Sequence, residues 1–488
     1  MLPLLAVGFP PLTDALGHLG RYAIQTGAAS SPALQEGFTY RWQLIGNLGV
    51  DLLVEVLQPL IGLEPAVRLI VIATQLLAAG GIILTSRALH GRITPFAVLA
   101  LPLIYGFPFQ YGFLNFSLSM ALALVVFPAW LAIRKRRSGL VAGVFLAIAG
   151  LLLWLCHTFG WAFLGLLCGS FSLHALWAEG KRGPSLVAAV LADCCALLLP
   201  LVPMLLWRTS SGDATTGGWS ALLKIVWLVS IFRSGWGMAD WISAGIVVGT
   251  VCALLILKPV RMHPAIAIAV LLCLAAFLAL PSRVFGSYYA DMRLLPYTLI
   301  IALLGFRPFE GAPRIRGGLM VLAMAFLVVR VALTTADFME KDRRIEANLA
   351  ALDVIGPGSR VVNFAVEACD TSWRVNPLKH IGGFAIARRS AFTNEQWDVA
   401  GANGLSVHYP AGRQFVADPS QSVTLRDCPA TGLPALTEVL PRLPVSAFDY
   451  LWIHGVDPQA VELPFTAREV WRGESGIVYA LGDTPASR

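Results

Sequence analysis

The chain has 488 residues, of which 57% are hydrophobic and only 13% are charged. Soluble globular proteins are about 45–50% apolar and about 25% charged, so this composition predicts a protein whose surface largely faces lipid. The formal net charge is +7. No Lys/Arg run is interleaved with aromatic residues, which argues against nucleic acid as a partner, and the basic loops of a membrane protein account for the charge.

The first twelve residues form an apolar stub that is too short to span a membrane. It has no basic region and no small-residue cleavage site, so no cleavable signal peptide is predicted. Asp14, His18 and Arg21 follow at spacings i, i+4 and i+7, which places them on one face of a helix. Two interpretations stay open: a solvated first turn with a dipole-favoured acid, or a site where a carboxylate, an imidazole and a guanidinium meet.

Ten later segments are apolar enough to cross a membrane, which takes about 20 residues. They are 66–86, 93–110, 113–133, 139–157, 159–178, 185–207, 241–258, 263–281, 291–306 and 317–336. Segments 46–63 and 221–237 contain ionisable residues and are predicted to lie along the membrane surface as amphipathic helices.

Basic residues gather in alternate loops between these segments, and such loops stay in the cytoplasm. The loops contain Arg87 and Arg92, then 134–137, then Lys181 and Arg182, then Lys258 and Arg261, then Arg307, Arg314 and Arg316. Loops 13–65, 208–240 and 282–290, and everything after about residue 337, are therefore predicted to lie outside. We expect a multi-pass protein of the plasma (inner) membrane, with residues 1–336 forming the transmembrane domain.

Charged residues, Pro and Gly return after Asp337, and residues 337–488 are predicted to form an extracytoplasmic α/β domain. Strands are expected at 360–366, 448–453 and 476–481, and helices at 342–355 and 431–441. Cys369 and Cys428 are the two cysteines of this segment. A single pair in an oxidising compartment predicts a disulfide, and the alternative is two buried thiols.

Further polar residues lie where the predicted spans reach the outer face. Asp291 and Arg293 begin one span and are either functional or an ordinary interfacial ion pair. Tyr111 and Asn115 flank a turn between two spans, and this turn either belongs to a site or is part of an aromatic belt. His157 ends another span, and a lone His is commonly a hydrogen-bonded structural residue.

Few ionisable residues are expected at the middle of the membrane. Asp193 is the main exception, and Arg330, inside the last span, is expected to reach outward to the surface. A secondary transporter would place its charged groups near the midplane. An enzyme that acts on a lipid headgroup would place them at the interface, which is the pattern found here.

These segments resemble the GT-C superfamily of membrane glycosyltransferases, and more closely its uncharacterised bacterial members that use a polyprenyl-phosphate sugar. The resemblance covers residues 1–336. It rests on a Pro-x-x-Asp-x-x-x-His-x-x-Arg stretch (Pro11, Asp14, His18, Arg21), Gly-Phe-Leu-Asn-Phe at 112–116, His157, and Asp-x-Arg-x-Leu-Pro at 291–296. In two respects the sequence departs from the family: only a stub precedes the first motif, and Asp14 has no acidic neighbour of the kind that binds metal in many members.

The resemblance implies a glycosyltransferase that moves a sugar from a polyprenyl-phosphate carrier to an extracytoplasmic glycan, lipid or protein in cell-envelope polysaccharide synthesis. Asp14 would be the base of an inverting displacement. Arg293 or Arg21 would bind the phosphate. The remaining candidate substrate-binding residues are His18, Tyr111, Asn115, His157 and Asp291. No cofactor is certain, and use of a divalent metal stays open.

Two other classes of function remain. A transporter or flippase for a lipid-linked glycan would carry internal repeats and polar residues at the midplane, and neither is visible. A non-catalytic scaffold for envelope polysaccharide assembly would not need Asp14.

Overall fold

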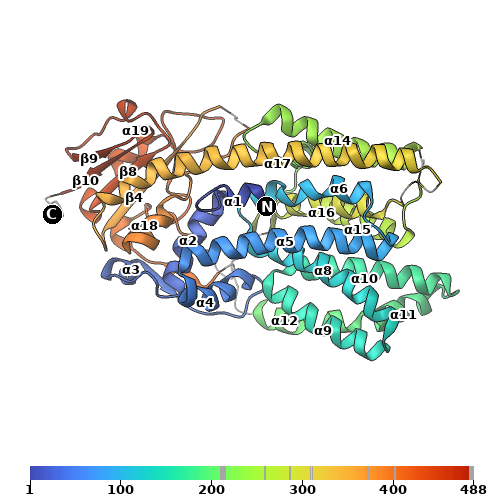
Figure 1. Ribbon diagram of the computed structural model, residues 1–488. Coiled ribbons are helices and arrows are strands. Elements are labelled where there is room, and N and C mark those ends of the chain that lie inside the picture. Colours follow the sequence, from blue (N-terminus) through green and yellow to red (C-terminus); the bar gives the residue numbers. More distant parts are fainter. Residues whose placement is uncertain are drawn as a thin grey trace.

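The structure is a computed structural model that describes residues 1–208, 216–257, 260–284, 287–307, 309, 311–370, 373–399 and 403–482. Lys258, one of the basic loop residues, lies outside this described part. Figure 1 shows a helical bundle at one end and a sheet-containing C-terminal part at the other, with the long helix α17 running from one to the other.

Six helices of the described chain are long and apolar enough to cross a membrane. They are α5 (Leu63–His90), α8 (Leu114–Arg136), α9 (Gly139–Cys156), α10 (Thr158–Ala178), α14 (Gly237–Leu257) and α17 (Pro313–Leu349), the last with its following turn η3 (Ala350–Asp353). Helices α15 (Pro264–Ala279) and α16 (Ala290–Gly305) are shorter and lie at two further predicted spans. The prediction of a polytopic helical membrane protein is confirmed.

Two predicted spans are not single helices. Segment 93–110 is divided into α6 (Pro95–Ala100), η1 (Leu101–Tyr105) and α7 (Phe107–Tyr111), and segment 185–207 into α11 (Gly183–Cys194), η2 (Cys195–Leu198) and α12 (Leu201–Arg208). Pro102, Pro108 and Pro200 lie at or beside the breaks. Proline has no N–H to donate and its ring clashes with the preceding turn, so the helices end there.

The helix predicted at 342–355 is confirmed as far as Asp353, but it is not separate from the last span, because α17 continues without a break to Leu349 and η3 follows. No Gly or Pro occurs between Gly318 and Gly356, so the sequence contains no signal that would end the helix earlier.

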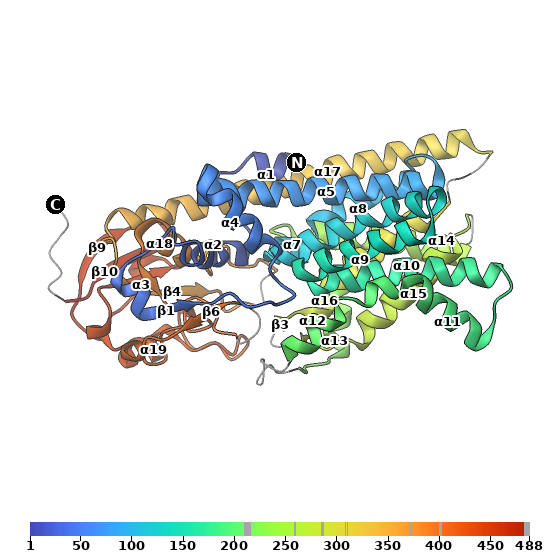
Figure 2. The same ribbon diagram turned by 90° about the horizontal axis from the view of Figure 1, so that it is seen from below.

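The segment between the stub and α5 folds against the C-terminal part (Figure 2). Its elements follow the short α1 (Leu2–Leu5) and are α2 (Thr13–Gln25), α3 (Pro32–Gly37), β1 (Phe38–Tyr40) and α4 (Gly49–Ile61). Strand β1 pairs antiparallel with β6 (Leu405–Val407), with Thr39 opposite Ser406. An ion pair of Glu36 with Arg360 adds to this contact, and Glu64 in the first turn of α5 pairs with Arg388.

The C-terminal part is built on a six-stranded sheet in the order β5-β4-β8-β10-β9, with β7 also on β4. The strands are β4 (Arg360–Glu367), β5 (Phe392–Thr393), β7 (Ser422–Thr424), β8 (Tyr450–His454), β9 (Arg468–Arg472) and β10 (Gly476–Ala480). Strand β4 is parallel to its neighbours β5, β7 and β8, whereas β10 is antiparallel to β8 and β9. The three strands predicted from sequence correspond to β4, β8 and β10.

Two short helices accompany the sheet. Helix α18 (Gly382–Arg389) packs on α2, while the helix predicted at 431–441 is only α19 (Leu436–Val439) followed by η5 (Leu440–Arg442). Cys369 and Cys428 form a disulfide with a Cα–Cα distance of 5.6 Å.

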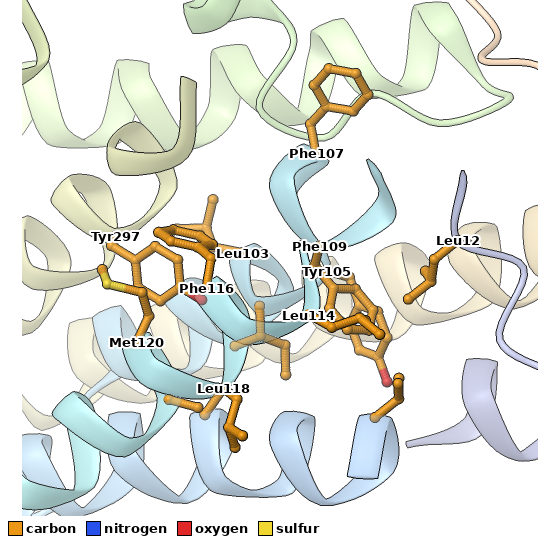
Figure 3. Packing of buried hydrophobic residues seen from close by; sticks show 14 of the residues in the cluster. Leu12, Leu103, Tyr105, Phe107, Phe109, Leu114, Phe116, Leu118, Met120 and Tyr297 are labelled. Atoms are coloured by element: carbon orange, nitrogen blue, oxygen red, sulfur yellow. The ribbon is translucent and has the colours of Figure 1, made fainter. Parts of the chain in front are cut away.

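Aromatic packing inside the bundle holds the helices that carry the polar residues described below. Phe116 of α8 contacts Tyr297 of α16 edge-to-face, with ring centroids 5.6 Å apart. Figure 3 shows these rings with Leu103 and Met120, all buried. Because buried side chains pack closely, Asn115 and Arg293, on the same two helices, are held at fixed positions.

Candidate active site at the junction of the bundle and the C-terminal part

Asp14 lies in the first turn of α2, with its side chain only 13% exposed. The turn at Gly112 presses on this point: Gly112 has φ +103°, and a Cβ there would lie 2.8 Å from the backbone nitrogen of Asp14. Glycine is required at such a position because it tolerates both the positive φ and the close approach. The first residue of the Gly-Phe-Leu-Asn-Phe motif therefore packs directly against the N-terminal turn of α2.

Asp14 is placed among charges of both signs. The pKa of its carboxyl group is raised to about 7, chiefly by burial. The negative charge of Asp418 also raises this pKa, whereas the positive charges of Lys379 and Arg293 lower it. His380 Nε2 lies 3.8 Å from Asp14 Oδ1. A carboxyl group with a pKa near neutrality has the property that a general base needs.

Arg293 is buried, with 6% of its surface exposed, and its hydrogen-bond partners are neutral. It donates to Ser287 Oγ and to the carbonyl oxygen of Tyr288, both at 2.9 Å, and lies 3.4 Å from His157 Nε2. Its guanidinium carbon lies 3.8 Å from the centre of the Phe113 ring. Among the residues that the structure describes, no carboxylate lies within ion-pair distance of Arg293.

Other buried cations differ from Arg293 in this respect. Lys224 forms an ion pair of 2.7 Å with Asp291, which also accepts a hydrogen bond of 3.1 Å from Trp227 Nε1. Asp291 is thus committed to Lys224, and the alternative of an Asp291–Arg293 pair does not hold in this structure. A buried charge without a counter-ion is costly, so the exception at Arg293 points to an anionic ligand.

Two ionisable residues behave differently from the sequence-based expectation. Arg330 does not reach outward to the surface: it is 2% exposed and pairs at 2.9 Å with the buried Asp240. Asp193 is not isolated within the membrane part, because it pairs at 2.5 Å with Arg134. In both cases a partner far away in sequence neutralises the charge, which is less costly than leaving it alone in an apolar surrounding.

Arg21 belongs to a second polar network. It forms an ion pair with Asp51 of α4, and both residues are buried. Asp51 Oδ2 also accepts from Asn115 Nδ2 at 2.9 Å, and Asn115 Oδ1 accepts from the backbone nitrogen of Val50 at 2.6 Å. Asp51 belongs to segment 46–63, which is predicted to lie along the membrane surface, and the structure buries its side chain against α2 and α8. The network joins α2, α4 and α8 behind the Asp14 site.

Asp14, His18 and Arg21 share α2 but have different neighbours. The His18 ring lies 4.9 Å from that of Trp397 and 6.0 Å from that of Tyr22. Burial lowers the pKa of His18 to about 3, so it is neutral at physiological pH. Of the two arginines considered for phosphate binding, Arg21 already has a carboxylate partner, so the geometry favours Arg293.

Tyr111 joins the two halves of the site. Its ring centroid lies 5.3 Å from that of Tyr289, which precedes α16 and adopts a left-handed φ of 58°. A left-handed conformation is unfavourable for a bulky residue, and such strain concentrates at functional sites. Tyr289 also contacts Trp227, with ring centroids 5.6 Å apart, so aromatic contacts link Tyr111 to the tryptophan that donates a hydrogen bond to Asp291.

Sequence reasoning missed Asp51, Lys379, His380 and Asp418. The last three lie in turns of the C-terminal part and reach Asp14 only through the tertiary fold. Within the described ranges no group of three His, Cys, Asp or Glu side chains lies close enough to hold a metal ion, and the question of a divalent metal stays open.

Comparisons with known proteins concern the fold. No protein-family model matches the sequence, and no curated protein matches it. The crystal structure of ArnT from Cupriavidus metallidurans in the apo state has a TM-score of 0.53 and 12% identity, covering 98% of this chain and 95% of that chain. The crystal structure of the same protein bound to undecaprenyl phosphate has a TM-score of 0.51 and 13% identity, covering 100% of this chain and 96% of that chain. Over nearly its whole length, this chain therefore resembles ArnT in fold.

Proposed function

We propose that this protein is a membrane glycosyltransferase that transfers a sugar from a polyprenyl-phosphate carrier to a hydroxyl group of an acceptor. The observation that carries the proposal is Arg293, a buried cation with neutral partners in the same site as Asp14, a buried carboxylate whose pKa is about 7. The likeness in fold to ArnT, solved bound to undecaprenyl phosphate, supports the same class of donor.

The two residues divide the chemistry. Asp14 removes the proton of the acceptor hydroxyl while that oxygen forms a bond to the anomeric carbon of the sugar. The bond between this carbon and the phosphate oxygen breaks, and its electron pair stays on the phosphate. Arg293 stabilises the negative charge that develops there. The anomeric configuration inverts, and polyprenyl phosphate leaves.

The site lies at the end of the bundle that meets the C-terminal part (Figure 1). We place this end outside the cytoplasm, because basic loop residues such as Arg87, Arg136 and Arg307 occur at the opposite ends of their helices. A phosphate headgroup at the membrane surface would then meet Arg293 from the lipid side. The acceptor, a glycan, lipid or protein, would approach Asp14 from the C-terminal part.

The test compares membranes that contain equal amounts of wild type, Asp14→Asn or Arg293→Gln, incubated with a panel of labelled undecaprenyl-phosphate sugars and total envelope acceptors. Two variants serve as controls for the substitutions themselves, Asp353→Asn and Arg343→Gln, whose side chains are 85% and 76% exposed. We expect Asp14→Asn to reduce transfer by about 10²–10⁴-fold, the usual contribution of a general base, and both controls to remain at the wild-type level.

The alternatives would give different results. Translocation of an intact labelled donor across vesicles without transfer would support a flippase. Unchanged polysaccharide assembly by Asp14→Asn, with no transfer by the wild type, would support a scaffold and overturn the proposal.

A further inference from the structure

The face of the C-terminal sheet that carries Asn363, Trp452 and His454 is unusually polar for a buried surface. Alternation along β4 and β8 places these three residues on one side and apolar residues such as Phe364 and Ile453 on the other. Asn363 lies opposite Trp452 in the register, and all three polar residues are completely buried. Buried polar groups are normally hydrogen-bonded, yet Trp452 Nε1 and both ring nitrogens of His454 have no partner in the described part of the chain.

Glu395 belongs to the same buried polar region and holds the turn that carries His380. Its carboxyl group is hydrogen-bonded to the backbone N–H groups of Gly382 and Gly383, which begin α18. Asn363 Nδ2 donates to it at 3.5 Å. The turn 379–383 is thus fixed from the sheet side, and His380 is presented toward α2.

Close backbone packing fixes α2 from the other side. A Cβ at Gly383 would lie 2.0 Å from the carbonyl oxygen of Leu16, and one at Gly17 would lie 2.6 Å from the Trp397 ring. Neither position tolerates a larger residue without a shift of the helix. These two contacts hold α2 close to the turn that carries His380.

His380 itself is completely buried and has no hydrogen-bond partner at either ring nitrogen among the described residues. Its ring centroid lies 4.6 Å from that of Trp397, which also contacts His18. The nearest acidic group is Asp14 Oδ1, at 3.8 Å from Nε2. This separation is too long for a hydrogen bond, but hydrogen bonds at catalytic groups commonly shorten when substrate binds.

The charges around His380 keep the ring neutral. Burial lowers its pKa well below the ordinary value, and the positive charge of Lys379 and the proximity of His18 and His454 act in the same direction. Asp14 faces it from α2, and Asp14 in turn faces Lys379, Asp418 and Arg293. A neutral imidazole retains one N–H, which Asp14 can accept.

We propose that His380 is the positioning residue of Asp14: its Nε2–H donates to Asp14 Oδ1 in the complex with substrates and leaves Oδ2 directed at the acceptor hydroxyl. This inference rests on the proposed function. The proton of the acceptor then moves to Oδ2 of Asp14, and the Nε2–H bond holds the carboxylate in the orientation in which that transfer occurs. His380 does not exchange a proton in this step.

Three substitutions of His380 separate a hydrogen bond from mere packing. The Phe variant keeps an aromatic ring against Trp397 but has no N–H to donate to Asp14. The Gln variant supplies an amide N–H that reaches Asp14. The Asn variant has the same amide on a side chain that is too short to reach it. We expect Phe and Asn to lower kcat at least tenfold with little change in KM for the donor, and Gln to restore much of the loss. Loss of a donor to the carboxylate also raises its pKa, so the acid limb of the pH–rate profile should move to higher pH for Phe and Asn.

The experiment measures kcat, KM and the pH–rate profile with one undecaprenyl-phosphate sugar that the wild type uses, together with undecaprenyl phosphate binding by native mass spectrometry. Equal kcat and equal acid limbs for Gln and Asn would overturn the role of His380, even if the Phe variant fails to fold. If Asp14→Asn retains full transfer, or if the wild type transfers nothing from the panel, the proposed function itself fails, and the role of His380 with it.

Discussion

The pH dependence of transfer gives the most direct test of Asp14. Its pKa of about 7 is raised from the ordinary value chiefly by burial. A general base works only when ionised, so activity should fall as the pH drops through this value. The ionised fraction rises about tenfold between pH 6 and pH 8, and kcat/KM should rise by a similar factor. The two neighbouring histidines, His18 and His380, are neutral across this range and add no step of their own.

Two neighbouring charges allow the assignment to be checked by direction alone. Asp418 raises the pKa of Asp14 and Lys379 lowers it. Asp418→Asn should therefore move the acid limb to lower pH, and Lys379→Gln should move it to higher pH. The assay is initial transfer rate against pH in detergent, with folding checked by size-exclusion profile. A flat profile between pH 5.5 and 8.5, or equal shifts in one direction for both variants, would refute the reasoning.

The raised pKa of Asp14 also affects stability, which should fall with rising pH whereas activity should increase. Because burial favours the protonated form of Asp14, its contribution to the free energy of unfolding is greatest below the pKa of the unfolded chain. That contribution is lost as pH rises through about 7. Asp14→Asn should therefore be more thermostable than wild type at pH 8 and similar to it at pH 4, a comparison that thermal unfolding of the purified protein can make.

Three further predictions follow from single contacts. Arg293→Gln should weaken binding of undecaprenyl phosphate by about 10²-fold or more, because a buried charge-assisted hydrogen bond is lost. Native mass spectrometry measures this binding, and an unchanged affinity would show that Arg293 does not bind the phosphate. Gly112→Ala should reduce kcat without loss of folded protein, because the added Cβ would lie 2.8 Å from the Asp14 nitrogen; wild-type kcat would contradict the close approach. Replacing Cys369 and Cys428 by Ser opens the loop that the disulfide closes, with a sequence separation of 59. The free energy of unfolding of the C-terminal part should fall by about 4 kcal/mol, because the unfolded chain gains conformational entropy. Denaturant unfolding measures this change, and an unchanged midpoint would contradict the disulfide.

Local features of this protein could be predicted from its sequence with good success. The helix that carries Asp14, the apolar helices and the strands β4, β8 and β10 follow from short-range periodicity and the placement of Pro and Gly. The Gly112 turn and the Asp291 to Pro296 segment were noticed as unusual, although their partners were not. An ion pair of Asp291 with Arg293 was one of two alternatives, and Asp291 instead binds Lys224, 67 residues away.

The parts that could not be predicted depend on contacts between distant segments. The ionisable Asp51 predicts an amphipathic helix at the membrane surface, and only the fold brings Arg21 and Asn115 to it. His380 lies in a turn without any motif. One usable signal was present: Asn363 and His454 interrupt the apolar pattern of two buried strands, and such local inconsistencies concentrate near functional sites.

The pairing of β1 with β6 bears on how the protein matures in the cell. Thr39 of β1 and His408, which follows β6, are 369 residues apart, and their side chains lie 2.6 Å from each other. At a synthesis rate of about 5–20 residues per second, the early strand waits about 20 to 70 s before its partner has been made. Asp418 follows His408 in the chain, so throughout that interval Asp14 lacks this neighbour and the candidate site is incomplete. The candidate site is therefore complete only after residue 418 has been made and the C-terminal part has folded around it, and we expect no transfer by a chain that stops before that residue.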